Sequence, residues 1–336
     1  MRLLCMFLLF SLMLSLAVSN KVEERCVKVP QRALTREPRS GLHRNVIPKT
    51  SLWVRTQGKV KNAHDKVIVL VHGTSGSNEY MRCVQEQLAK DYFTVALDLR
   101  GHGLSDQTPS SLLNYTHEVF ADDIHAVLDK LGYNRNLVWV GVSIGGSIGL
   151  SYIDKYPNQV ANFVALSAGP GLYRLSGNVS WPYPIPVGGT PETLLPESTY
   201  CSSQLTLAKE KIAQNQARAG PIIGTNLIPN AWTEDLRPLL QKVKVPSLLG
   251  YGSIDPLQPN GGSTKYLHEE ISNSVLVRFE GAGHLMTITK PQAVSLAIKI
   301  FLEEGDFLPE KLVSLNKGCF VCPQVKVGPS RSACVA

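Results

Sequence analysis

The chain carries the sequence GVSIG at residues 141–145, directly after the apolar run LVWV at residues 137–140. An apolar run that leads into Gly-x-Ser-x-Gly is typical of a nucleophile elbow, a sharp turn between a strand and a helix. The flanking glycines let the backbone bend where a side chain would obstruct it. We expect this turn to raise the Ser143 hydroxyl above the edge of a sheet and to bring the amide of Ile144 beside it.

Segments with the character of strands and helices alternate on both sides of this turn. The run VIVLV at residues 67–71 is apolar throughout, as expected for a strand buried in a parallel sheet. Further strands are expected at residues 93–97, 137–140, 163–166, 246–251 and 275–279, and helices at residues 79–90, 116–131, 148–155 and 291–302. The alternation predicts an α/β fold with a doubly wound, mainly parallel sheet and helices on both faces.

Residues 170–238 interrupt the alternation. They are rich in proline and contain only one clear helical stretch, near residues 205–219. A segment of this length is too long for an ordinary loop, which indicates an inserted cap or lid. The core would then consist of a first part at residues 51–169 and a second part at residues 239–305.

A serine nucleophile needs a base that takes its proton and a third group that holds the tautomer of that base. In sheets of this type the chain order is Ser, acid, His. Asp255 follows the strand expected at residues 246–251, and His284 follows the next strand, so both lie at carboxyl ends of strands, where ligands bind. The order and the positions predict a catalytic triad of Ser143, Asp255 and His284.

Other aspartates and histidines of the chain fit the roles of acid and base less well. Asp122 and Asp123 are the nearest rivals to Asp255, but they lie inside an expected helix that precedes Ser143 in the chain. The remaining histidines of interest are interpreted as surface or scaffold residues: His102, His117, His125 and His268.

Acyl transfer also needs an oxyanion hole, a set of donors aimed where negative charge develops. The amide of Ile144 is one candidate, and the second should come from the loop after residues 67–71, where HGT occupies residues 72–74. We expect the amide of Thr74 to be this donor. Structural support of the site is expected from His72, Gly73, Gly141 and Gly145.

These motifs resemble those of the α/β-hydrolase superfamily over roughly residues 50–305. The matching sequences are HG at 72–73, DLRGHGLS at 98–105, GVSIGG at 141–146, GSIDPLQP at 252–259 and GH at 283–284. The resemblance implies the α/β-hydrolase fold, hydrolysis through an acyl-enzyme without a cofactor, and a cap that shapes the substrate pockets. It also implies that Asp98 and Arg100 belong to a structural turn. The sequence SIGG at 143–146 is more similar to the esterase, monoglyceride-lipase and carbon–carbon hydrolase branches than to the proline-peptidase branch.

Two positions bear on the branch of this superfamily. The resemblance implies that the epoxide-hydrolase and dehalogenase branches use Asp at position 143, so Ser143 argues against both. Many relatives carry a bulky residue after His-Gly, where this chain has the small Thr74, so the acyl pocket is expected to differ.

The combined motifs predict a serine hydrolase that cleaves carboxylic esters of small molecules or lipids. An aminoacyl or peptide hydrolase, a thioesterase, a perhydrolase and a non-catalytic ligand-binding member of the fold are the alternatives. Residues 170–238 are expected to determine which acyl chain and leaving group are accepted, and their sequence is the least informative part of the chain.

The composition adds little to this prediction but excludes some classes of function. The 336 residues include 34 Lys and Arg against 27 Asp and Glu, which gives a formal net charge of +7. The basic residues are scattered, and no nucleic-acid motif accompanies them, so a solvated basic surface and no nucleic-acid partner are expected. The sequence leaves the oligomeric state open.

Residues 1–19 have the features of a signal peptide. Arg2 supplies a positive charge, residues 3–16 are apolar, and AVS at residues 17–19 places small side chains where a signal peptidase cleaves. The apolar run is short for a membrane span, which needs about 20 residues. We expect cleavage before Asn20 and a secreted or secretory-lumen protein with no stable membrane span, and an uncleaved anchor is the alternative. An N-terminal extension would occupy residues 20–50, and a cysteine-containing tail residues 306–336.

Export would place six cysteines in an oxidising compartment: Cys26, Cys83, Cys201, Cys319, Cys322 and Cys334. Disulfides are expected there, but the sequence does not choose among the pairings. The spacing of Cys319 and Cys322 also suits zinc, yet no second pair of ligands follows, so no metal site is predicted. A buried thiol is the alternative for Cys83. Asn114 and Asn178 lie in glycosylation sequons.

Overall fold

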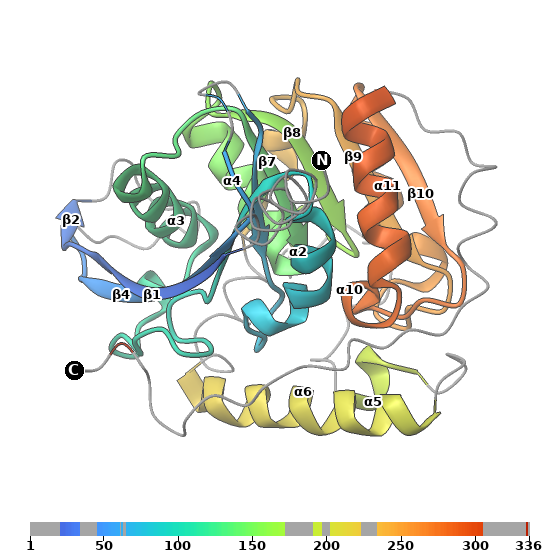
Figure 1. Cartoon of the computed structure of the whole chain (residues 1–336), viewed down its shortest axis with the longest axis horizontal. Helices are drawn as coiled ribbons and strands as arrows, with labels where there is room; N and C mark the ends of the chain where they lie inside the picture. The colour runs from blue at the N-terminus through green and yellow to red at the C-terminus, as the bar shows by residue number, and fades with distance from the viewer. Residues whose placement is uncertain are drawn as a thin grey trace, which may run out of the picture.

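The computed structural model describes residues 21–33, 46–60, 62, 65–171, 191–196, 202–222, 234–304 and 334. An eight-stranded sheet forms the centre of the molecule, with the strand order β1-β4-β6-β5-β7-β8-β9-β10 (Figure 1). Strands β5 to β10 run parallel to one another, and β1 and β4 are antiparallel at one edge. The predicted mainly parallel sheet is therefore confirmed.

The strands of this sheet are β1 (Val22–Val29), β4 (Thr50–Gln57), β5 (Val67–Val71), β6 (Phe93–Leu97), β7 (Leu137–Val142), β8 (Val160–Leu166), β9 (Ser247–Gly252) and β10 (Ser274–Phe279). A small separate sheet pairs β2 (Arg32–Ala33) with β3 (Val46–Ile47). The α-helices are α2 (Arg82–Leu88), α3 (His117–Leu131), α4 (Ile144–Lys155), α5 (Pro191–Leu194), α6 (Ser202–Ile222), α8 (Arg237–Leu240), α9 (Gly262–Glu270), α10 (Met286–Thr289) and α11 (Pro291–Glu304). Short 3₁₀ turns are η1 (Asn78–Met81), η2 (Leu112–Asn114) and η4 (Pro259–Gly261).

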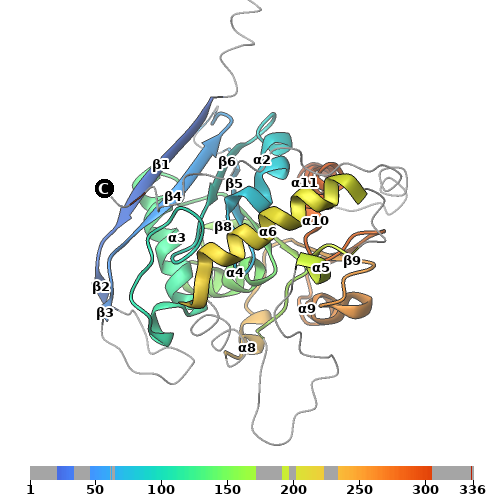
Figure 2. The same ribbon diagram turned by 90° about the horizontal axis from the view of Figure 1, so that it is seen from below.

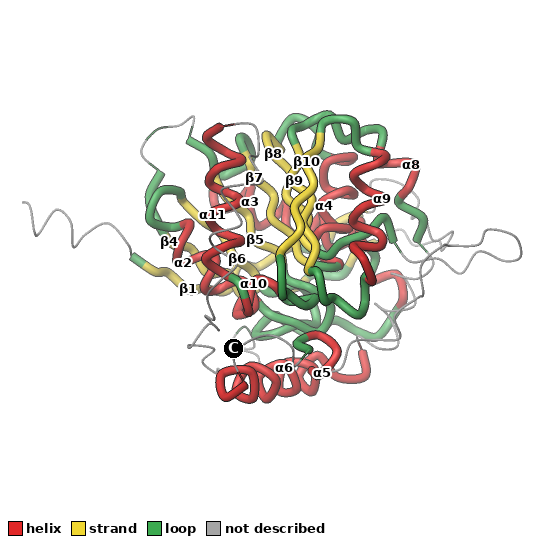
Figure 3. Tube along the Cα trace, turned by 90° about the vertical axis from the view of Figure 1, so that its right-hand side faces the viewer, coloured by secondary structure: helices red, strands yellow, loops and turns green. Residues whose placement is uncertain are grey.

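Successive side chains of the central strands enter two different hydrophobic layers. In β5, Val69 and Val71 contribute to a buried cluster with α3 and α4, whereas Ile68 and Leu70 contribute to a second cluster with α2 and α11. Because side chains alternate across a strand, an all-apolar run requires cover on both faces. Figure 3 shows α2 and α11 on one side of the sheet and α4 and α9 on the other, which confirms the doubly wound arrangement.

Helix α3 has clear start and stop signals in the sequence. Thr116 is the N-cap, and its hydroxyl accepts a hydrogen bond of 3.2 Å from the amide of Val119. The helix ends at Gly132, which has a left-handed φ of 80°. The prediction of a helix over residues 116–131 is confirmed.

Two other helices begin elsewhere than predicted. The segment expected as one helix over residues 79–90 is divided into η1 and α2. The Asp98 carboxylate accepts hydrogen bonds from both the backbone and the side-chain amide of Asn78, and these bonds hold the first turn in place. Helix α4, expected from residue 148, begins at Ile144 because Ser143 itself is the N-cap.

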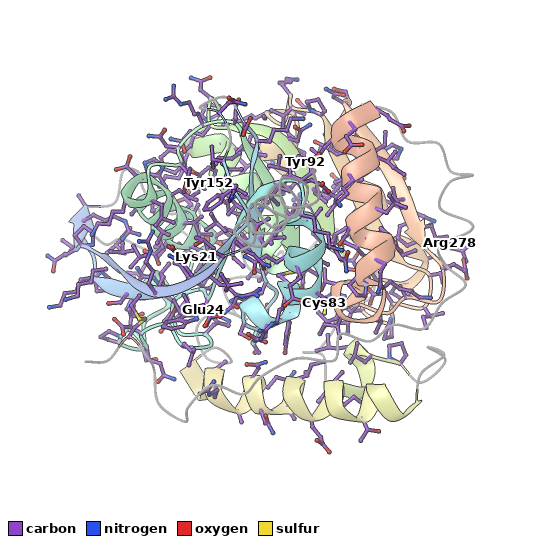
Figure 4. All side chains as sticks on the ribbon, in the orientation of Figure 1. Lys21, Glu24, Cys83, Tyr92, Tyr152 and Arg278 are labelled. Atoms are coloured by element: carbon purple, nitrogen blue, oxygen red, sulfur yellow. A yellow bond between two sulfur atoms is a disulfide. The ribbon has the colours of Figure 1, made fainter. Side chains whose placement is uncertain are left out.

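The segment interpreted as an N-terminal extension, residues 20–50, contains the edge strand β1. Its first four residues, Val22 to Arg25, are exposed on both sides of the strand, while Val27 and Val29 are buried in the core. A disulfide bond joins Cys26 of β1 to Cys334. Cys83, which lies on α2 (Figure 4), is also disulfide-bonded, so the alternative of a buried thiol is wrong for this residue. Cys201, Cys319 and Cys322 lie outside the described residues.

Helices α5 and α6, from the segment interpreted as a cap, lie across one end of the sheet (Figures 1 and 2). The buried residues of α6 recur at helical spacing and form one stripe: Ala208, Ile212, Asn215 and Ala219. Their neighbours along the helix are exposed or half-buried wherever the structure describes them. None of the helices in the described ranges has the length and apolar character that crossing a membrane requires.

A buried ion pair fixes α3 to the turn after β6. Arg100 Nε and Asp123 Oδ2 lie 2.5 Å apart, and a second bond of 2.7 Å joins Arg100 Nη2 to Asp123 Oδ1. Both side chains are almost completely buried, and Arg32 also contacts the Asp123 carboxylate. Removal of one partner from such a pair leaves a buried charge without compensation.

We expect Asp123→Asn to lower the free energy of unfolding by about 3–5 kcal/mol, because Arg100 then remains charged and buried beside a neutral amide. Urea denaturation followed by circular dichroism measures this loss. Asp91→Asn is the matched control, since the Lys299–Asp91 pair is partly exposed and its removal should cost less than about 1 kcal/mol. Equal losses in the two variants would contradict the prediction.

Candidate functional site

Ser143 lies between β7 and α4 in an unusual backbone conformation. Its φ is 55° and its ψ is −125°, in a region that residues with side chains seldom adopt. The amide of Ser143 donates a 2.8 Å hydrogen bond to Leu166 O of the neighbouring strand β8, and Ser143 O accepts one from Gly146. The elbow is thus fixed on both sides, and its strained residue is the predicted nucleophile.

The glycines of the elbow occupy positions where no side chain fits. A Cβ on Gly145 would lie 2.3 Å from Val71 O and 2.8 Å from His72 O, both of which are backbone atoms. A Cβ on Gly141 would lie 2.2 Å from the carbonyl carbon of Gly145. This close approach places the start of α4 directly against the end of β5.

The loop after β5 reaches the nucleophile itself. A Cβ on Gly73 would lie 3.1 Å from Ser143 Cβ and 3.8 Å from Ser143 Oγ, so this loop lies directly against Ser143. Thr74 comes next in the loop and is half-buried, and Ile144 is the first residue of α4. Their amides as oxyanion donors stay a prediction.

His72 is held inside this loop by two hydrogen bonds. Its Nδ1 lies 2.7 Å from Gly73 O, and its Nε2 lies 3.1 Å from the amide of Leu99. Because the Leu99 amide can only donate, Nε2 accepts and Nδ1 carries the proton. Burial, together with the nearby His102, holds the pKa of His72 well below its usual value, so the ring is neutral. A neutral ring bonded at both nitrogens can support the loop.

Asp255 and His284 are brought together at the carboxyl ends of β9 and β10. His284 Nδ1 lies 2.8 Å from Asp255 Oδ2, and both side chains are buried. The loops that carry them also touch, since the amide of Ile254 donates to Ala282 O at 3.1 Å. A Cβ on Gly252 would lie 2.2 Å from Ala282 O, which leaves room only for glycine.

The surroundings of Asp255 favour the ionised form of its carboxylate. Burial alone would raise the pKa of Asp255, but its attraction to His284, the hydrogen bond from His284 and the amide of Leu257 outweigh burial and lower it. Asp255 Oδ1 accepts from Leu257 N at 2.9 Å and from Gln258 N at 3.3 Å. These donors leave Oδ2 to the imidazole of His284.

The rival residues are engaged in other contacts. Asp122 binds Lys155 at 2.6 Å and Tyr156 at 2.8 Å, and Asp123 belongs to the Arg100 pair. The histidines interpreted as surface or scaffold residues have separate partners: His102 bonds Arg100 O, His117 pairs with Glu234, His125 stacks on Tyr156, and His268 bonds Ser274. The Glu234 partner of His117 was not expected, because its segment offers no readable motif.

Only one of the two glycosylation sequons, that of Asn114, lies in the described part of the chain. Asn114 is buried, and its side-chain amide donates a 2.6 Å hydrogen bond to Pro109 O. A glycan on this nitrogen would require the side chain to leave the interior, which disfavours modification there. Asn178 lies outside the described residues.

Comparison with known proteins places this geometry in a family. The family model described as the alpha/beta hydrolase fold matches residues 66–186. The chain belongs to the α/β-hydrolase superfamily.

The relatives of this α/β hydrolase include esterase YbfF of Escherichia coli (strain K12), which is 24% identical over 266 residues, 75% of this chain and 99% of that protein. A thermophilic esterase from Thermogutta terrifontis has a similar structure, with a TM-score of 0.63, 21% identity, and coverage of 83% of this chain and 98% of that one. A bromoperoxidase from Bacillus anthracis superimposes with a TM-score of 0.58 at 24% identity, covering 77% of this chain and 96% of that one. The relatives support hydrolase activity.

Within the described ranges of the α/β hydrolase, no group of three or more His, Cys, Asp or Glu side chains is arranged to hold a metal ion.

The turn predicted as structural is connected to the loop that follows Gly73 through Asp98. The Asp98 carboxylate accepts a hydrogen bond of 2.6 Å from Asn78 N at the end of that loop, and one of 2.7 Å from Leu104 N within the turn itself.

Asp98 gives this loop a pH dependence. Complete burial raises the pKa of Asp98 from 3.8 to about 6, and the donors from Asn78 and Leu104 offset only part of this effect. Between pH 3.8 and about 6 the folded chain therefore holds a proton that the unfolded chain has lost. The free energy of unfolding should fall by about 3 kcal/mol from this group as the pH rises through that window.

Urea denaturation at closely spaced pH values between 4 and 7 measures this contribution as the difference between wild type and Asp98→Asn, which does not titrate. The fall should be shallower in the variant. Parallel curves for the two proteins would contradict the raised pKa of Asp98.

Proposed function

We propose that this α/β hydrolase is a secreted serine hydrolase that cleaves carboxylic esters through an acyl-enzyme on Ser143. The observation that carries the proposal is the buried hydrogen bond between His284 Nδ1 and Asp255 Oδ2, at the sheet edge that also bears the strained Ser143. An acid held against one nitrogen of an imidazole fixes its tautomer, and a serine needs this kind of base.

The proton transfers follow from that tautomer. With its Nδ1–H donated to Asp255, His284 has its free lone pair on Nε2, which removes the proton of the Ser143 hydroxyl as Oγ attacks the acyl carbon. The same nitrogen then gives the proton to the departing alcohol. A water molecule, activated by His284 in turn, attacks the acyl-enzyme and releases the carboxylic acid together with free Ser143.

Negative charge on the carbonyl oxygen would be stabilised by the amides of Thr74 and Ile144. The close approach of Gly73 to Ser143 supports this assignment, because it leaves the next amide of the loop near the nucleophile. The loss of one such donor costs roughly 3–4 kcal/mol of transition-state stabilisation.

The part of the substrate beyond the ester would meet the cap at residues 170–238. The described buried residues of the cap are mostly apolar, with Asn215 as the polar residue of the α6 stripe. Leu194, Leu195 and Ile212 belong to one cluster with Tyr80 and Met286. Leu194 O also accepts a bond from the Leu285 amide, next to His284. An apolar group on the acyl or alcohol side therefore suits this site, which fits a small-molecule or lipid ester.

We expect Ser143→Ala to abolish both ester turnover and covalent labelling by a fluorophosphonate, because Ser143 is the proposed nucleophile at the turn between β7 and α4. Labelling followed by mass spectrometry identifies the modified residue. Ser151→Ala is the control, since this buried hydroxyl of α4 has no hydrogen-bond partner in the described part of the chain. Undiminished labelling of Ser143→Ala would refute the proposal.

A panel of oxygen esters, thioesters, aminoacyl substrates and peracid formation separates the proposed reaction from its alternatives. The bromoperoxidase relative makes the peracid assay worth including. Turnover that is fastest on esters supports the proposal. Preference for another substrate class would keep the triad and change the reaction, and absence of all turnover would favour a binding protein.

Secretion is the second part of the proposal. The Cys26–Cys334 disulfide supports it, because disulfides persist in oxidising compartments. Expression of the full chain in cultured eukaryotic cells should deliver a protein to the medium whose first residue is Asn20, as read by N-terminal sequencing. A chain that lacks residues 1–19 should stay inside the cells, and a retained, uncleaved N-terminus on the full chain would contradict this part.

A further inference from the structure

Ser167 is a second buried serine with a strained backbone beside the site. It directly follows β8 and has a φ of 45°, in the left-handed region that disfavours residues other than glycine, asparagine and aspartate. The side chain is 1% exposed. Strain of this kind persists only where the surrounding structure enforces it, and it is concentrated at functional sites.

The backbone of this segment joins the elbow to the acid loop. Leu166 O accepts the 2.8 Å bond from the Ser143 amide, and the amide of Ser167 donates a 2.7 Å bond to Gly250 O in β9. On its other side, Ala168 O accepts from Thr264 Oγ1 at 3.0 Å. Ser167 is therefore held between the strand that carries the nucleophile and the strand that precedes the acid.

The hydroxyl of Ser167 is one of the groups that lower the pKa of the neighbouring Asp255 carboxylate. It is buried and makes no regular hydrogen bond with any described residue. Bonds of catalytic groups are often long or poorly aligned in free enzymes and tighten when substrate is bound.

The carboxylate has room for this additional donor. Asp255 Oδ1 is occupied by the amides of Leu257 and Gln258, and Oδ2 by His284. A carboxylate offers about four acceptor positions, so one position remains. A hydroxyl donor there would prevent rotation of the carboxylate away from the imidazole.

From this arrangement we infer that Ser167 is a positioning residue, whose hydroxyl holds the Asp255 carboxylate in the orientation that keeps His284 ready to act as the base. The inference rests on the proposed function, because it assigns to Ser167 a role in the same reaction.

The test compares Ser167→Ala with Ser167→Gly. Both remove the hydroxyl, but glycine adopts a positive φ without strain, so this variant should fold at least as well as the wild type. We expect kcat to fall about tenfold in both variants, with KM changed less than about twofold, because a hydrogen bond to a charged group is lost. Ser151→Ala, which also removes an unpartnered buried hydroxyl, should leave both constants unchanged.

The pH profile separates positioning from mere stability. Without the donor the pKa of Asp255 rises, so the Asp255–His284 pair takes up its proton at higher pH and the acid limb of kcat/KM moves upward by about half a unit. A purely structural role would lower the amount of folded enzyme and leave this limb in place. Wild-type kcat and profile in Ser167→Gly would overturn the inference.

A measurement without substrate keeps this result independent of the proposed ester hydrolysis. The Nδ1–H proton of His284 is expected as a low-field resonance in the proton NMR spectrum, and its position reports the bond to Asp255. The resonance should shift and exchange faster with water in both variants. Failure of ester turnover in the wild type would refute the proposed function alone, whereas an unchanged resonance in both variants would overturn the role of Ser167.

Discussion

The site depends on the absence of a side chain at Gly145, which lets the backbone of α4 approach the end of β5. The carbonyl oxygens of Val71 and His72 occupy the space that a Cβ would need. The carbonyl of Gly145 is bonded in turn by Trp139 Nε1 at 2.9 Å, so the turn is held from the strand below. This contact fixes the position of α4 relative to β5. It therefore also fixes the position of Ser143 relative to the loop that begins at His72.

Helix α3 provides a second level of organisation, through buried polar contacts rather than through the sheet. Asp123 binds Arg100 in the turn after β6, Asp122 binds Lys155 at the end of α4, and His117 pairs with Glu234 near the return of the cap. One helix thus fixes a turn, a helix and the cap connection to each other. Isolated charges of this kind would be costly in the interior, and in pairs they define the orientation of their elements.

The acid and the base of the predicted triad could be located because each follows an apolar strand that is recognisable in the sequence. Asp255 and His284 come directly after β9 and β10, and the parallel order then brings them together. Strand β1 was harder to predict, because an edge strand that exposes charged residues to solvent has no continuous apolar run in its sequence. The pairing of Cys26 depends on contacts across the whole chain, and Ser167 depends on a backbone angle, so neither leaves a local signal.

The Cys26–Cys334 bond also changes how the molecule would carry a mechanical load. It closes a covalent ring across a sequence separation of 308, which leaves only short segments of the described chain outside it. A pull applied at the two ends of the polypeptide would pass from the strand residue before Cys26 through the sulfur bridge to Cys334. The part of the ladder between β1 and β4 that begins at Cys26 would therefore not be peeled apart, whereas the pairs that residues 22–25 form with β4 would carry the load. The sheet that supports Ser143, Asp255 and His284 would stay outside the path of the force.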